Sequence, residues 1–146
     1  MGTVTESIEI DASPQEVWDV VMDPARLGDW VSAHEDLVDA PGGELSPGDE
    51  FTQRLKVAGQ KFKITWHLKS ADEPSVADWT ARGPARSKAR VTYRFEPSGE
   101  GTRFDYVNEF SPPGGKLNVA ASLVGGPPAG RAARKSLKNL KKLFEG

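Results

Sequence analysis

The sequence predicts a single α+β domain, spanning residues 1–146, in which an antiparallel sheet of about seven strands is covered on one face by helices. Three features predict this arrangement. Apolar and polar residues alternate in several successive segments, which is typical of strands with one buried face. A well-capped helix follows the first strand, and an amphipathic segment lies near the C-terminus. We therefore expect a curved sheet, two short helices after the first strand, and a long, kinked C-terminal helix over the sheet.

The first strand is expected at residues 3–10, although neither phase of this segment is cleanly apolar. Ser13, Pro14 and Glu16 then combine an N-cap residue, a proline in the first helical turn and the acid of a capping box. Together they predict the start of a helix. Residues 24–30 begin with a proline, which ends this first helix, and they predict a second short helix.

The pattern changes to a period of two from about Ser32 onward. One apolar and one polar face on strands joined by short turns predict an antiparallel sheet that is covered on one side only. Hairpin turns are expected at Gly59, at residues 73–75 and at residues 97–101. The most regular strands are expected at residues 50–57, 60–69, 76–82, 88–96 and 102–110.

The C-terminal segment has to cover the apolar face. Residues 131–144 carry apolar side chains at helical spacings, and residues 116–124 have apolar positions of their own. Between them lies the sequence GGPPAG at residues 125–130. Because its two prolines remove two backbone donors, we expect the helix to break or kink there, and we expect the break to act as a gate.

A cavity between the sheet and this helix is a further expectation. The inward sheet face is rich in rings, whereas side chains around the break are small, so space can remain between them. The alternative is a filled core in which large and small side chains interdigitate. Polar residues on the inward face favour a ligand pocket, because an unpaired buried polar group costs roughly 1–3 kcal/mol. The expected lining is Trp30, Phe51, Gln53, Phe62, Ile64, Trp66, Trp79, Tyr93, Tyr106, Asn108, Leu117, Ala121 and Val124.

The order of elements and the stretch IDASPQEVWDVVMDPARLGDW at residues 10–30 resemble the START / polyketide cyclase / Bet v 1-like superfamily, also called SRPBCC, which has the helix-grip fold. The resemblance covers essentially the whole chain. It implies a deep cavity between a curved sheet and the last helix. Members bind lipids, polyketides, hormones or other hydrophobic molecules, and some cyclise or dehydrate polyketides. Fold alone does not decide among these functions.

Three functional hypotheses therefore stay open. The first is a protein that binds a hydrophobic or aromatic, lipid- or polyketide-like molecule without turnover. The second is a polyketide cyclase or dehydratase with His34, Tyr93 and Tyr106 as candidate catalytic residues, although each of them also suits a core or surface role. The third is a surface-interaction protein that uses the basic side of the last helix, where the alternative is a solvated helix face. Its basic residues are Arg131, Arg134, Lys135, Lys138, Lys141 and Lys142.

Composition excludes several kinds of site. The absence of cysteine rules out disulfides and thiolate chemistry, and it fits a cytoplasmic protein. With only two histidines, His34 and His67, we expect no metal ion and no cofactor. Strand phase places His67, Arg54 and Arg94 on the outer face. No apolar run approaches the roughly 18 residues of a membrane helix, and we expect neither a membrane span nor a nucleic-acid partner.

Overall fold

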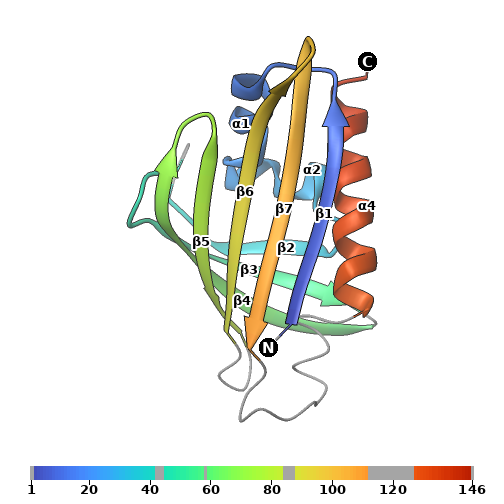
Figure 1. The fold of residues 1–146 in the computed structure, drawn as a ribbon. Coiled ribbons are helices and arrows are strands. Elements are labelled where there is room, and N and C mark those ends of the chain that lie inside the picture. The colour runs from blue at the N-terminus through green and yellow to red at the C-terminus, as the bar shows by residue number, and fades with distance from the viewer. Residues whose placement is uncertain (1, 42–44, 58, 84–87, 112–126, 146) are drawn as a thin grey trace.

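The structure is a computed structural model of the chain and describes residues 2–41, 45–57, 59–83, 88–111 and 127–145. In this part of the chain, seven strands form one antiparallel sheet with the order β1-β7-β6-β5-β4-β3-β2. The sheet is strongly curved, since β1, β6 and β7 run upright in Figure 1 whereas β2, β3 and β4 run across it. The strands are β1 (Gly2–Ile10), β2 (His34–Asp39), β3 (Glu50–Val57), β4 (Gln60–Asp72), β5 (Val76–Arg82), β6 (Lys88–Ser98) and β7 (Gly101–Ser111).

Two short helices follow β1, and a longer one lies near the C-terminus, as the sequence predicts. The helices are α1 (Pro14–Val21), α2 (Leu27–Trp30) and α4 (Pro127–Leu143), and the 3-10 turn η1 (Pro24–Arg26) leads into α2. The predicted α+β helix-grip architecture is therefore confirmed.

The predicted capping box at the start of α1 is confirmed. The Ser13 hydroxyl accepts a hydrogen bond from the backbone N–H of Glu16 at 3.2 Å. The Glu16 carboxylate accepts one from the backbone N–H of Ser13, also at 3.2 Å. These two bonds satisfy donors that an uncapped helix start leaves free, so α1 begins where the sequence indicates.

The hairpin between β6 and β7 is tighter than predicted. Pro97 and Ser98 still pair with β7, opposite Thr102 and Gly101. The expected loop at residues 97–101 is therefore wrong, and only Gly99 and Glu100 form the turn. Gly99 has a φ of 58°, a backbone conformation that glycine adopts without steric cost, so a two-residue connection is possible here.

The C-terminal helix also differs from the prediction. Residues 127–130 form its first turn, so the helix expected from residue 131 begins four residues earlier and the expected break does not extend over residues 127–130. Pro127 and Pro128 cost little in this position, because the first backbone N–H groups of a helix have no intrahelical acceptor. The expected helical segment 116–124 and the glycines at 125 and 126 lie outside the described residues, and the gate stays a prediction.

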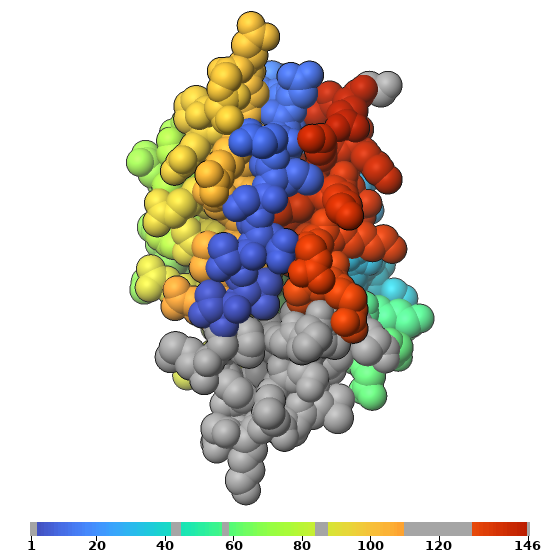
Figure 2. Space-filling model, turned by 45° about the vertical axis from the view of Figure 1, so that its right-hand side comes forward, coloured from blue at the N-terminus to red at the C-terminus, as the bar shows by residue number. Residues whose placement is uncertain are grey.

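Helix α4 covers one side of the sheet by packing along β1 and against α2. Figure 2 shows α4 beside β1, with β6 and β7 on the other side of that strand. The predicted apolar stripe of α4 faces inward, because Ala133, Leu137 and Leu140 are buried. On the outer surface, Arg134 Nη1 lies 3.2 Å from Glu6 Oε2 of β1.

The alternation of the strands produces one apolar face, as predicted. Phe95 and Phe104 lie on this face at the centre of the core, with ring centroids 5.0 Å apart, and Trp18 of α1 packs on Phe95 at 5.1 Å. On the polar face, Arg54 Nη1 donates to both carboxylate oxygens of Asp36 at 2.7 and 2.6 Å.

Two glycine-to-alanine substitutions should have opposite effects on stability. A Cβ at Gly101 would overlap the backbone carbonyl oxygen of Ile10, whereas a Cβ at Gly130 would meet only Arg134 Nη1 at 3.8 Å. We expect Gly101→Ala to lower the free energy of unfolding by about 1–3 kcal/mol. Gly130→Ala should raise it by about 0.5–1 kcal/mol, because alanine is the better helix former. Urea titrations measure both, and a Gly101→Ala protein as stable as the wild type would contradict the close approach of β7 to Ile10.

Candidate functional site

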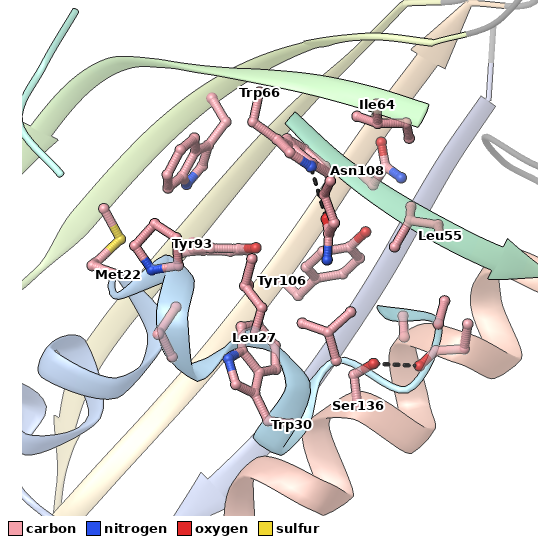
Figure 3. Close-up of a pocket in the computed structure, with 18 of the residues that line it drawn as sticks. Met22, Leu27, Trp30, Leu55, Ile64, Trp66, Tyr93, Tyr106, Asn108 and Ser136 are labelled. Carbon is pink, nitrogen blue, oxygen red and sulfur yellow. Dashed lines mark hydrogen bonds between the residues drawn. The ribbon is translucent and has the colours of Figure 1, made fainter. Parts of the chain in front are cut away.

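A cavity of about 120 Å³ lies between the apolar face of the sheet and helices α2 and α4. Strands β3 to β7 supply most of its rings and most of its polar groups, α2 adds the ring of Trp30, and α4 contributes mainly small side chains. Figure 3 shows side chains from both layers converging on this space. The sequence-predicted residues that line it are Trp30, Phe51, Gln53, Ile64, Trp66, Trp79, Tyr93, Tyr106 and Asn108.

Four predicted lining residues are not among those the structure places at the cavity. Phe62 is buried instead in a small separate cluster with Leu55, Ile64 and Ala81. It lies one strand repeat beyond Ile64 toward the β3–β4 turn, so its ring packs near the end of the strands. Leu117, Ala121 and Val124 lie outside the described residues.

The sequence analysis missed several contributions from the helical side. Met22 and Leu27 line the cavity from the end of α1 and from α2, and Leu45 lines it from the segment before β3. Leu27 lies three residues before Trp30, so helical spacing could have identified it. Leu45 lies in an irregular segment and carries no comparable signal in the sequence.

A buried amide connects the cavity to His34. Trp66 Nε1 donates to Gln53 Oε1 at 3.0 Å, which the dashed line from Trp66 marks in Figure 3. Gln53 Nε2 lies 2.9 Å from His34 Nδ1. Because an amide nitrogen only donates, Nδ1 must accept, and His34 is therefore a neutral imidazole with its proton on Nε2. Burial lowers the pKa of His34, while Asp36 and Glu35 act in the opposite direction.

The position of His34 does not support the catalytic role that the sequence analysis considered for it. It is not among the residues that line the cavity, and it reaches the cavity only through the side chain of Gln53. Its ring packs over Gly28, where an added Cβ would lie 3.4 Å from His34 Cδ2. The imidazole thus orients the Gln53 amide from the side that faces away from the cavity.

The two tyrosines are neutral hydrogen-bonding groups within the cavity wall. Their ring centroids lie 6.0 Å apart, and in Figure 3 the hydroxyl of Tyr93 points into the space. Burial raises the pKa of Tyr93 far above its ordinary value, and the neighbouring Tyr106 adds to this effect. Burial also raises the pKa of Tyr106 to about 12, against the influence of its hydrogen bond with Asn108. Both can donate a hydrogen bond at neutral pH, but neither can act as a base.

Hydrogen bonds tie the segment after α2 to α4, and we call this set the clasp. The backbone N–H of Ser32 donates to Ser136 Oγ at 2.9 Å, and Ser32 Oγ donates to the Ala132 carbonyl at 3.0 Å. Asn139 Nδ2 donates to the Trp30 carbonyl at 3.2 Å. The clasp therefore fixes the position of Trp30 relative to the helix that forms the opposite wall.

Two indole groups at the cavity have no hydrogen-bond partner among the described residues. Trp30 Nε1 and Trp79 Nε1 are both buried and meet no acceptor in this part of the chain, in residues that are only 3% and 4% exposed. Buried donors are paired in the great majority of cases, so an unpaired one calls for an explanation. The indole of Trp66 lines the same cavity but is satisfied by Gln53.

Charge is absent from the described lining, which contains no Asp, Glu, His, Lys or Arg side chain. In the described ranges there is also no cluster of three or more His, Cys, Asp and Glu residues that could hold a metal ion. None of the helices in the described part of the chain is long and apolar enough to cross a membrane. The site can therefore offer shape, rings and neutral hydrogen bonds to a guest.

The neutral state of His34 predicts a pH dependence of stability. Protonation of His34 at Nδ1 would bring two N–H donors face to face, one on the imidazolium and one on the Gln53 amide, and would break their hydrogen bond. Because the folded-state pKa lies below the ordinary 6.5, the stabilising contribution is complete above that pH and is lost as the pH falls toward the folded-state value. His34→Asn keeps an oxygen near the position of Nδ1 but does not titrate.

We expect the wild type to lose stability relative to His34→Asn on acidification between about pH 8 and pH 5. Urea denaturation of both proteins across this range measures the difference. Parallel stability profiles would show that His34 accepts a proton as easily in the folded protein as in the unfolded chain.

Comparison with known proteins identifies the family. A family model described as polyketide cyclase / dehydrase and lipid transport matches residues 1–145. An uncharacterized protein of Mycobacterium tuberculosis is 26% identical over 151 residues, which cover 99% of each chain. Protein CV1439 from Chromobacterium violaceum has the same fold, with a TM-score of 0.74 and 20% identity over 99% of this chain and 97% of that one. DynU16, a protein in the dynemicin biosynthetic locus, has a TM-score of 0.68 and 14% identity over 98% of this chain and 47% of that one. The chain belongs to the polyketide cyclase/dehydrase and lipid transport family, within the Bet v 1-like superfamily that its sequence resembles.

Proposed function

We propose that this protein binds a hydrophobic or aromatic small molecule in the cavity between the sheet and α4. The observation that carries the proposal is the cavity itself, about 120 Å³ in volume and lined mainly by rings and aliphatic side chains. About 10–15 Å³ is enough for one water molecule. An apolar cavity of larger volume with a few convergent polar groups is the usual form of a ligand site.

The aromatic wall is held in place before any ligand arrives. Phe51 stacks on Trp66 with ring centroids 6.4 Å apart, and Trp79 meets Phe51 edge-on at 5.7 Å. Trp79 also contacts Trp66 at 6.3 Å. Rings that already pack on one another lose little freedom when a ligand binds, so the wall favours affinity for flat, apolar guests.

A cyclase or dehydratase is a second candidate, which the family description and the neutral hydroxyl of Tyr93 support. Such a hydroxyl can polarise a carbonyl group, as enolisation requires. Enolisation also needs a base, and no described lining residue is one at neutral pH. This favours binding without turnover, and incubation with a poly-β-ketone would reveal a cyclised product if the enzyme reading were correct.

The third hypothesis, a surface interaction through the basic side of α4, has less support. Arg134 pairs with Glu6, and Lys141 lies 3.8 Å from Glu145. These contacts partly neutralise the basic surface within the chain itself. Exposed charges without a bound partner are ordinary for a helix that faces solvent.

Filling the cavity should abolish ligand binding without unfolding the protein. Ala133 is 8% exposed and lines the cavity from α4, so a phenyl ring introduced there would occupy the ligand's space. We expect Ala133→Phe to weaken binding of tetralin, an uncharged bicyclic hydrocarbon, at least tenfold, or by about 1.4 kcal/mol. Titration calorimetry measures the affinity, and thermal unfolding checks that the variant is folded.

Lys135→Phe is the matched control, because it adds the same ring two residues away at an exposed position of α4. It should leave tetralin binding unchanged. Native mass spectrometry of freshly purified wild type should in addition detect any molecule retained from the cell. The proposal fails if wild type carries no such molecule and does not bind tetralin, or if a folded Ala133→Phe protein binds tetralin as tightly as wild type.

A further inference from the structure

We infer that the cavity selects an uncharged aromatic molecule carrying a carbonyl-type oxygen, which accepts hydrogen bonds from the indole N–H groups of Trp30 and Trp79. The inference rests on the proposed function and narrows it to a chemical class. Three features of the described cavity lining lead to it: its lack of charge, its unpaired donors and the packing of both indole rings against Tyr93.

The lack of charge argues against an ionised ligand. A carboxylate or phosphate that enters an apolar cavity loses its hydration and needs a cation or several donors in return. None of the described lining residues is a cation. His34, which contacts the lining amide of Gln53, is kept neutral by burial and by this contact. Fatty-acid anions and phosphorylated lipids therefore do not match this site.

The unpaired donors specify what a neutral ligand should carry. An indole N–H can only donate, so the missing partners of Trp30 and Trp79 must be acceptors. A pure hydrocarbon would leave both groups unsatisfied, as they are now. A ligand with a carbonyl oxygen would instead satisfy a group that the folded protein has already removed from water, which makes the gain larger than at a surface.

Both of these indoles pack against the ring of Tyr93. The Tyr93 ring is 6.4 Å from that of Trp30 and 6.2 Å from that of Trp79, with both pairs near edge-on. In Figure 3 the Tyr93 hydroxyl points into the cavity. An acceptor bound near the Tyr93 hydroxyl would therefore lie next to the two residues that carry the unpaired donors, and the aromatic body of the ligand would lie toward Phe51 and Trp66.

Trp66 provides a control within the same wall. Its indole N–H is already bonded to Gln53 Oε1 at 3.0 Å, so it has no donor to offer a ligand. Substituting any of these tryptophans by phenylalanine removes a similar area of ring. Only the Trp30 and Trp79 substitutions also remove a free donor, so the dependence on the carbonyl separates the two effects.

The experiment compares three probes of nearly equal size: tetralin, 1-tetralone and tetralin-1-carboxylate. With wild-type protein, calorimetry should show 1-tetralone binding at least about fivefold tighter than tetralin, as expected for one or two added hydrogen bonds. The carboxylate should bind at least about tenfold more weakly than 1-tetralone, because its charge is unpaired in the cavity. In ¹H–¹⁵N spectra, 1-tetralone should move the indole N–H signals of Trp30 and Trp79 downfield, whereas that of Trp66 should keep its position.

The variants test the assignment to individual donors. Trp30→Phe and Trp79→Phe should each reduce the ratio of 1-tetralone to tetralin affinity toward one, whereas Trp66→Phe should retain the wild-type ratio. Both affinities in the ratio are measured on the same variant, so loss of ring area does not affect the ratio. If a variant does not fold, the indole N–H shifts of the wild type still identify which tryptophans donate to 1-tetralone. Three results would overturn the inference: equal affinity for tetralin and 1-tetralone, tightest binding of the carboxylate, or an equal fall of the affinity ratio in all three variants. Each of them would still be compatible with a protein that binds hydrophobic molecules. Failure of all three probes to bind would count against the proposed function itself.

Discussion

The cavity exists because most of the residues that α4 presents to the rings of the sheet are small. Ala132, Ala133 and Ser136 line the cavity together with Leu137, whereas Leu140, further along the helix, is buried in the core outside the lining. A helix with leucines at all these positions would fill the space as a normal core does. The size of three side chains on one helix therefore decides whether the apolar face of the sheet is a core or a binding site.

Small side chains alone would not keep the space open, because a helix can move inward to restore contact. The clasp opposes this movement. The Ser32 N–H donates to Ser136 Oγ, and the Asn139 amide donates to the Trp30 carbonyl, so both bonds are made only at one separation of the two segments. A donor that loses its acceptor inside the fold costs more than a few van der Waals contacts can return. Polar ties with fixed geometry thus stabilise a cavity that apolar packing alone would reduce.

The sequence predicted those parts of the molecule that depend on local interactions. The capping box at Ser13 and the alternating strands follow from residues a few positions apart, and both are found as expected. The position of Phe62 could not be predicted, since strand phase gives the face of a sheet but not the place along its curvature. The role of His34 also depends on a distant residue, Gln53, which strand pairing brings within 2.9 Å. At α4, the rule that proline breaks helices was applied to residues that begin one.

Burial explains both what the site can do and what it lacks. Burial raises the pKa values of Tyr93 and Tyr106, so both stay protonated and act as neutral donors. Burial also lowers the pKa of His34, which favours the unprotonated imidazole next to Gln53. A proton cannot pass from a ligand to His34 along this path, because the Gln53 amide holds its own hydrogens and would have to give one up. His34 therefore acts on orientation: as an acceptor it directs the Gln53 N–H₂ outward, which leaves the amide oxygen to Trp66 and takes that indole out of ligand binding. Trp30 and Trp79 have no such partner among the described residues, and their indole N–H groups are therefore the donors to which we assign ligand recognition.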